Sequence, residues 1–182
     1  EQLAVSRQPV LQALRLLKKD GFVLDAPGRG LLVAPLDADW IANVYEVRSA
    51  LDALAARLAS AGGYAFDSEL IAQGRKAARG KNIKTMMDAD MAFHSSIYQA
   101  ARNPLIEQSA QLHWQHIRRA MGAVLQHSTV REAVWDAHEQ IAQAIAARKP
   151  DAAEKLMRGH GARASSNLSQ NLNQVLSRGD KK

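Results

Sequence analysis

The sequence predicts a mostly α-helical protein, in which one helix and a hairpin precede an antiparallel six-helix bundle. From residue 37 onward alanine and leucine are abundant, and Gly or Pro divides the chain into helix-length segments. Only residues 22–33 contain two short apolar runs separated by a turn rich in Pro and Gly. The loops between the helical segments are short, which favours antiparallel packing of consecutive helices.

The first predicted helix, residues 6–21, has one apolar side and one basic side. Ser6 is predicted to cap it by accepting from free backbone N–H groups. Val10, Leu14 and Leu17 recur at helical spacing and form the apolar stripe. The basic side carries Arg7, Arg15, Lys18 and Lys19. Such a helix suits the major groove of DNA, and a solvated surface helix packed on a core is the alternative.

The hairpin that follows is predicted from strands at residues 22–24 and 31–33. Pro and Gly between them indicate a tight turn. Arg29 lies near the predicted tip, where it could reach a phosphate or a minor groove. A helix, a turn and an arginine-tipped hairpin together form the pattern of a winged helix-turn-helix, here a partial one.

The bundle is predicted from helices at residues 37–61, 67–79, 83–101, 104–127, 130–148 and 150–176. Asn103 is the expected cap of the fourth of these, with Pro104 at its first position. Residues 34–36 read as a connection. We therefore expect a DNA-binding domain at 1–35, incomplete at its N-terminus, and an all-helical domain at 36–178.

Composition narrows the classes of function. The 182 residues carry a net charge of +6, which favours polyanionic partners such as DNA. The absence of cysteine excludes disulfides and thiolate metal sites. We find no signal peptide and no apolar run of about eighteen residues, and so expect a cytoplasmic protein without a membrane partner.

Four residues of the bundle suggest a metal site. Asp90 and His94 are four positions apart and share one helix face. His138 lies midway along the fifth bundle helix and His160 lies on the last. One carboxylate and three imidazoles could converge on zinc, nickel, manganese or iron. The alternative is that these are ordinary core or surface histidines, as His113 and other scattered histidines would be.

The N-terminal segment resembles the GntR family of bacterial transcription regulators. The matching residues are Leu3 to Arg7, Pro9, Val10, Ala13, Leu14, Leu17, Gly21, Pro27 to Leu31, and Val33. The resemblance implies operator DNA as a partner, a homodimer, and a motif whose first helix and most of whose second would precede Glu1. It places DNA contacts at Ser6, Arg7, Gln8, Arg15, Arg29 and Gly30. Leu11 departs from the family, which has arginine there, so base preference is expected to differ.

The bundle resembles the effector domain (FCD domain) of the FadR branch of that family. The residues that carry this resemblance are Tyr45 to Arg48, Leu51, Asp52, Ala55 to Ala59, Asp90, Phe93, His94, Ala101 to Asn103, His138, Ile141, Ala144, Ile145, Ala152, Ala153, Met157 and His160. Six helices suggest the VanR-like group. One departure is Gly161, which is expected to loosen the last helix locally.

The resemblance also implies two ligands. A divalent metal ion would be bound by Asp90, His94, His138 and His160, with zinc as first choice and nickel or manganese as alternatives. A small carboxylate effector would be clamped by Arg48 through paired hydrogen bonds. The alternative for Arg48 is an ion pair with its i+4 neighbour Asp52.

We therefore predict a ligand-responsive DNA-binding transcription regulator and not an enzyme. The rival is a metal-dependent hydrolase that uses the same four ligands. No second histidine follows His138 at the zinc-protease spacing, and we can name no general base and no catalytic residue. A regulator for which the ion itself is the signal is a third reading.

Overall fold

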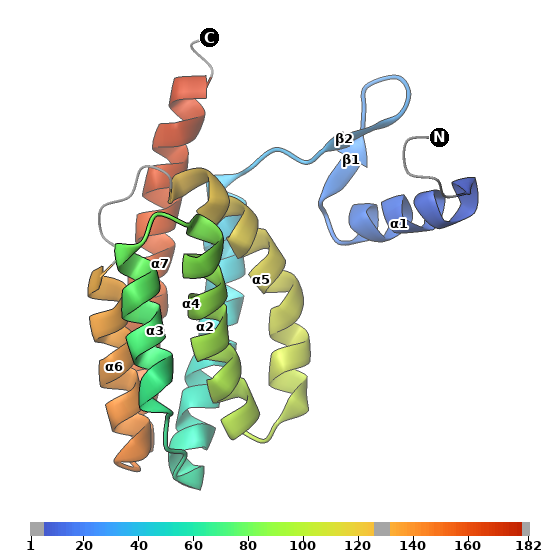
Figure 1. Ribbon diagram of the computed structural model, residues 1–182. Coiled ribbons are helices and arrows are strands. Elements are labelled where there is room, and N and C mark those ends of the chain that lie inside the picture. The colour runs from blue at the N-terminus through green and yellow to red at the C-terminus, as the bar shows by residue number, and fades with distance from the viewer. Residues whose placement is uncertain (1–5, 126–131, 180–182) are drawn as a thin grey trace. The chain divides into compact units, whose positions relative to one another are not determined.

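The computed structural model describes residues 6–125 and 132–179 (Figure 1). Within those residues it contains seven α-helices and one two-stranded sheet. This is the predicted fold class, with six of the helices in the bundle. The chain divides into two compact units, Glu1–Leu36 and Asp37–Lys182, which are described separately below.

The first unit contains helix α1 (Arg7–Lys19) and strands β1 (Val23–Asp25) and β2 (Leu31–Val33). The two strands pair antiparallel, with Val23 opposite Val33. Gly28 and Gly30 in the connecting turn have φ of 98° and 95°, a conformation that side chains with a Cβ rarely adopt.

Two details of α1 differ from expectation. Ser6 stands at the N-cap position, but its side chain makes no capping hydrogen bond, so the predicted Ser6 cap is wrong. Lys18 Nζ lies 2.7 Å from an Asp25 carboxylate oxygen, so one of the four charges on the basic side is paired with the hairpin. Helix α1 contains no buried residue, and Leu17 of its apolar stripe is 42% exposed.

The second unit is a bundle of six helices. They are α2 (Ala38–Gly62), α3 (Ser68–Arg79), α4 (Ile83–Ala100), α5 (Pro104–Val124), α6 (Glu132–Ala146) and α7 (Pro150–Gly179). Asp37, Asp67, Asn82 and Asn103 accept hydrogen bonds from backbone N–H groups of the first turns of α2 to α5. The expected ends at His127 and Val130 lie outside the described residues.

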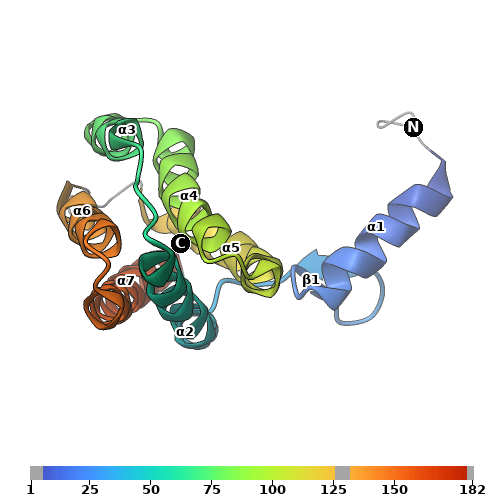
Figure 2. The same cartoon turned by 90° about the horizontal axis from the view of Figure 1, so that it is seen from below.

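Helix α2 packs against α4, α5, α6 and α7, and its contact with α7 is the most extensive (Figures 1 and 2). A Cβ built on Gly161 of α7 would lie 2.2 Å from Ser49 Oγ on α2. Glycine at this position therefore permits the close approach of the two helices, and α7 is continuous through it. Helix α3 packs against α4 and α6.

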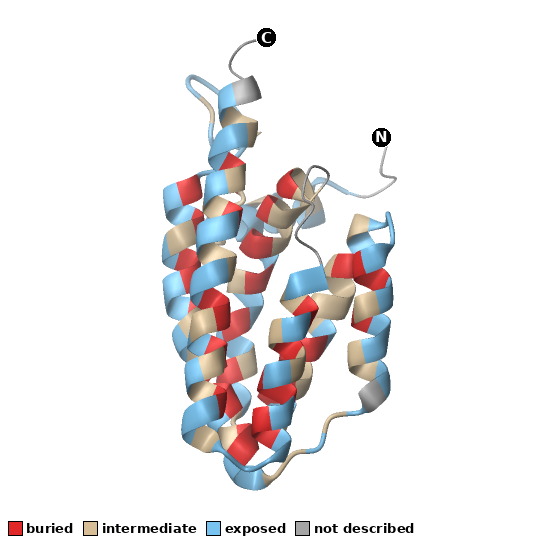
Figure 3. Ribbon diagram, turned by 90° about the vertical axis from the view of Figure 1, so that its left-hand side faces the viewer, coloured by how far each residue is buried: buried red, intermediate tan, exposed pale blue. Residues whose placement is uncertain are grey.

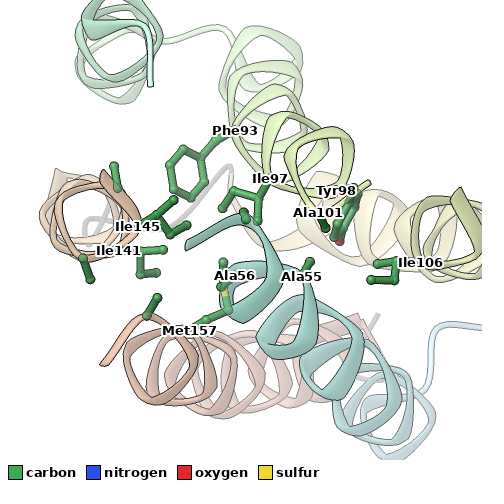
Figure 4. Close-up of a cluster of buried hydrophobic side chains, with 14 of the residues drawn as sticks. Ala55, Ala56, Phe93, Ile97, Tyr98, Ala101, Ile106, Ile141, Ile145 and Met157 are labelled. Atoms are coloured by element: carbon green, nitrogen blue, oxygen red, sulfur yellow. The ribbon is translucent and has the colours of Figure 1, made fainter. Parts of the chain in front are cut away.

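Buried residues lie mainly on the inner faces of the helices, and exposed residues lie mainly on the outer faces (Figure 3). Phe93, Ile97, Ile141, Ile145 and Met157 are at most 1% exposed and form the centre of the core (Figure 4). No helix in the described ranges combines the length and the apolar character that crossing a membrane requires.

Candidate metal centre

Three helices bring three imidazole rings together inside the bundle. His94 of α4, His138 of α6 and His160 of α7 are at most 8% exposed, and each offers a ring nitrogen within 4.8 Å of the others. The Nε2 atoms of His138 and His160 are 3.3 Å apart. Two nitrogens bound at about 2.05 Å to one tetrahedral ion are separated by roughly 3.3 Å, so this spacing fits a shared metal ion.

Asp90 lies next to this cluster. Its Oδ1 is 3.5 Å from His138 Nε2, and its side chain is 16% exposed. Asp90 and His94 stand four residues apart on α4, as the sequence indicated. The structure thus brings the three predicted histidine ligands together and places Asp90 beside His138.

Aromatic neighbours hold two of the imidazoles in place. The ring of His138 stacks on Phe93 with centroids 4.1 Å apart, and it meets the edge of Trp135 at 4.7 Å. His94 meets Trp114 edge-on at 5.2 Å. These contacts leave the rings little freedom to reorient, so the cluster is preorganised by the core around it.

Burial sets the protonation state of the cluster. Desolvation, reinforced by the nearby Arg48 charge, lowers the pKa values of His94 and His138 well below the usual value for histidine, and that of His160 to about 3. Burial raises the pKa of Asp90 to about 6. All three imidazoles are therefore neutral near pH 7, which is the form that binds a metal ion.

A cavity of about 150 Å³ adjoins the cluster. Arg48, Asp90, His94 and His160 contribute its polar lining, and Met121, Val124 and Leu168 are among its apolar residues. A cavity of this kind, largely apolar with a few converging polar groups, is typical of a small-molecule site.

Arg48 makes the ion pair with Asp52 that its sequence allowed, with its Nε 3.2 Å from Asp52 Oδ2. It also lines the cavity, and its role as a clamp for an effector stays a prediction. The guanidinium carbon lies 3.7 Å from the centroid of Trp114, so the charge also rests on an aromatic ring. Arg48 is 3% exposed, and its Nη2 has no hydrogen-bond partner among the described residues.

The sequence did not indicate every residue that lines the cavity. Asn167 and Asn171 of α7 lie at its wall beside the buried Leu168. Asn167 is exposed and Asn171 is half-buried, and two amides at i and i+4 on one helix face were the signal that could have found them. Tyr45 and Met121 also line the cavity, and residues of these two types are common in a helical core, so the sequence does not mark them as cavity residues.

The predicted DNA contacts all lie in the first unit and are exposed. Arg7, Gln8 and Arg15 lie on α1, with Ser6 directly before it, and Arg29 and Gly30 lie in the turn between β1 and β2. Leu11, which replaces the family arginine, is 48% exposed on α1. The basic residues are thus available on the surface of this unit.

Comparisons with known proteins show a family of regulators to which the sequence is similar. Residues 43–163 match the FCD domain family. An HTH-type transcriptional regulator in an unstable DNA locus of Streptomyces ambofaciens is 30% identical over 164 residues, which are 87% of this chain and 68% of that protein.

Solved structures show the same fold at lower identity. E. coli McbR/YncC superposes with a TM-score of 0.79 at 16% identity, over 93% of this chain and 82% of that one. A GntR transcriptional regulator from Rhodococcus gives 0.72 at 21% identity, over 92% and 82%. The matched effector domain, the curated relative and the shared fold together establish that this chain belongs to the GntR family of transcriptional regulators, in the branch with an FCD domain.

Proposed function

We propose that this regulator responds to a small carboxylate that binds beside a divalent metal ion in the helical unit. The observation that carries the proposal is the buried cluster of His94, His138 and His160, next to Asp90 and to a cavity that Arg48 lines. Membership of a family of regulators sets aside the hydrolase reading. The six-helix bundle supports assignment to the VanR-like group.

The donor set suits a divalent ion of the zinc, nickel or manganese type, and zinc is our first choice. Three neutral imidazole nitrogens and one carboxylate oxygen are ligands that such ions accept. A bound ion would supply positive charge at one end of the cavity. Within the protein, His138 and His160 would offer two Nε2 atoms that already lie 3.3 Å apart, and Asp90 would offer a negatively charged oxygen.

A carboxylate is the ligand that the cavity fits best. Arg48 offers a buried guanidinium whose Nη2 is unpartnered among the described residues, and a carboxylate can accept two parallel hydrogen bonds from such a group. The cavity volume of about 150 Å³ limits the ligand to a small organic acid. The apolar wall at Val124 and Leu168 would contact its carbon chain.

DNA binding falls to the first unit. We assign operator contacts to Ser6, Arg7, Gln8, Arg15, Arg29 and Gly30. Arginine side chains on a helix and at a hairpin turn suit the major groove and the phosphate backbone or minor groove, respectively. Leu11 offers no hydrogen bond to a base, so readout at its position is limited to apolar contact.

A homodimer is part of this proposal, because a two-fold protein matches a two-fold operator. Trp40, Val47 and Leu54 are spaced by seven residues on α2 and are 53%, 53% and 42% exposed. Trp40 and Leu54 are equidistant from Val47, so a two-fold axis at Val47 would place Trp40 of one copy against Leu54 of the other. Leu105 and Leu112 are also exposed and lie seven residues apart on α5, which packs against α2.

The dimer is tested by sedimentation equilibrium. A Val47→Glu variant buries two like charges at the axis and is expected to be monomeric, whereas Ala72→Glu, at an exposed position of α3, stays dimeric. A Val47→Glu variant that dimerises like the wild type would show that the two copies meet elsewhere.

The sensor reading is tested by isothermal titration of the zinc-loaded protein with acetate, lactate, succinate and citrate. We expect at least one acid to bind at one site per chain, and Arg48→Met to abolish its binding while zinc stays bound. If no acid binds and operator affinity follows free zinc alone, the ion is the signal and the effector proposal is wrong.

A further inference from the structure

One buried carboxylate that is not among the four proposed metal ligands lies close both to a proposed metal ligand and to the proposed effector-binding arginine. Asp52 of α2 is 3% exposed. Its Oδ2 lies 3.2 Å from Arg48 Nε and 3.6 Å from His94 Nδ1. Its Oδ1 accepts a hydrogen bond from the Tyr98 hydroxyl. Asp52 therefore stands between a proposed metal ligand and the proposed effector-binding arginine.

Two nitrogen atoms close to Asp52 lack a hydrogen-bond acceptor in the part of the chain that the structure describes. Arg48 Nε and His94 Nδ1 are buried and make no hydrogen bond to any described residue, although Asp52 Oδ2 lies close to both. A hydrogen bond from an imidazole N–H spans about 2.7–3.2 Å, so a shift of roughly half an ångström would join His94 to Asp52. Buried polar groups without partners are costly, which favours that shift.

Contact with Asp52 also decides which nitrogen of His94 faces the ion. A metal-binding histidine usually donates its second ring N–H to a carboxylate or a carbonyl, and this fixes the tautomer and the ring orientation. With Nδ1 directed at Asp52, Nε2 is the nitrogen left for a metal ion. His113 and His138 also have a buried, unpartnered Nδ1, but neither makes an ion-pair contact with Asp52 among the described residues.

We propose that Asp52 is a positioning residue for the sensor site: it accepts from His94 Nδ1, so that Nε2 is presented to the ion, and it holds Arg48 Nε, so that the outer edge of the guanidinium faces the cavity. The proposal rests on the metal-binding function proposed above. It makes one carboxylate common to the ion and to the effector. Loss of Asp52 should then disturb both, although Asp52 touches neither ligand.

The first test is the tautomer of His94, read by long-range ¹H–¹⁵N NMR correlation of the imidazole ring. In the wild-type chain we expect His94 to carry its proton on Nδ1, both with and without zinc, and Asp52→Asn to remove this preference. The matched control is Tyr98→Phe, which removes the hydroxyl contact to the same carboxylate and should leave the His94 tautomer unchanged.

The second test is zinc affinity, measured by competition with a chromophoric chelator. Loss of a partner of this kind typically weakens metal binding about 10- to 100-fold, so we expect a decrease of that size in Asp52→Asn and less than threefold in Tyr98→Phe. If Asp52→Asn does not fold, because Arg48 loses its counter-charge, Arg48→Met/Asp52→Asn is compared with Arg48→Met alone. That pair isolates the effect of Asp52 on the ion.

The outcomes separate the two proposals. If zinc binds and neither the tautomer nor the affinity changes in Asp52→Asn, the role given to Asp52 is wrong and the metal site stands. If the wild type binds no zinc but its His94 tautomer depends on Asp52, the contact stands and the metal function fails. An equal loss of affinity in Tyr98→Phe, without a change of tautomer, would show a merely structural role and overturn the proposal.

Discussion

Acidification from pH 6 to pH 5 should lower the free energy of unfolding of the metal-free bundle, and the size of the decrease follows from the pKa shifts of its buried groups. The pKa values of His94, His138 and His160 are lowered in the folded state, so each ring is neutral when folded and takes up a proton when the unfolded chain falls below its usual pKa of about 6.5. For a base whose pKa is lowered by folding, this stability is fully present above the pKa of the unfolded chain and is lost as the pH falls from there toward the lowered pKa of the folded state.

The carboxylates act in the opposite direction. The pKa of Asp90 is raised to about 6 in the folded state, whereas an aspartate of the unfolded chain titrates near 4. Between these two pH values the folded chain keeps a proton on Asp90, and unfolding releases it. Burial raises the pKa of Asp52 as well. Three protons gained and one or two released leave a net uptake of about one to two on unfolding. Each net proton is worth about 1.4 kcal/mol per pH unit, so the free energy of unfolding should fall by about 1.4–2.7 kcal/mol from pH 6 to pH 5.

Urea unfolding in the presence of a chelator measures this slope. Tryptophan fluorescence reports on the bundle alone, because Trp40, Trp114 and Trp135 all belong to the second unit. His160→Asn removes one of the three imidazoles and should reduce the slope by about 1.4 kcal/mol per pH unit. A free energy of unfolding that is flat or rising as the pH falls from 6 to 5 would refute the idea that the three rings are buried in the neutral form.

Two further predictions concern packing and DNA binding. Gly74→Ala should lower the free energy of unfolding of the bundle by about 1–3 kcal/mol, because its Cβ would lie 2.0 Å from the Trp135 ring. In the same urea unfolding experiment the control Gly122→Ala should be neutral or stabilising, because a Cβ there would have no neighbouring atom within 4 Å. Equal effects of the two substitutions would show that α3 and α6 are not in close contact at Gly74. Arg29→Ala should lower the slope of log K against log salt for duplex DNA by about 0.9, as expected for loss of one phosphate contact, and Lys155→Ala on α7 should leave it unchanged. An unchanged slope for Arg29→Ala would remove this arginine from the interface.

The sequence was sufficient for most of the fold because its signals were local. Asn103 and Pro104 marked a helix start that the structure confirms, with Asn103 Oδ1 accepting from Leu105 N–H at 3.2 Å. The helix predicted over residues 37–61 ends in the structure at Gly62, and Gly63 caps it in the left-handed conformation with φ 71°. Such signals act within a few residues and do not need the rest of the chain.

Interactions between distant segments were harder to predict. Spacing placed Asp90 and His94 on one face, but whether His138 and His160 join them stayed one of two alternatives that only the family resemblance favoured. The i+4 spacing paired Asp52 with Arg48, yet the approach of Asp52 to His94 depends on how α2 packs against α4. Gly161 was expected to loosen α7, and its contact with α2 became visible only in three dimensions.

The most direct test of the account is a zinc titration of the chelator-treated chain, followed by calorimetry and checked by elemental analysis. We predict one zinc per chain in the wild type and in His113→Ala, and loss of at least a hundredfold in affinity in His138→Asn, whose imidazole lies at the centre of the cluster. If His138→Asn folds and binds zinc as tightly as the wild type, or if the wild type binds no zinc, nickel or manganese, the buried imidazole cluster is not a metal site.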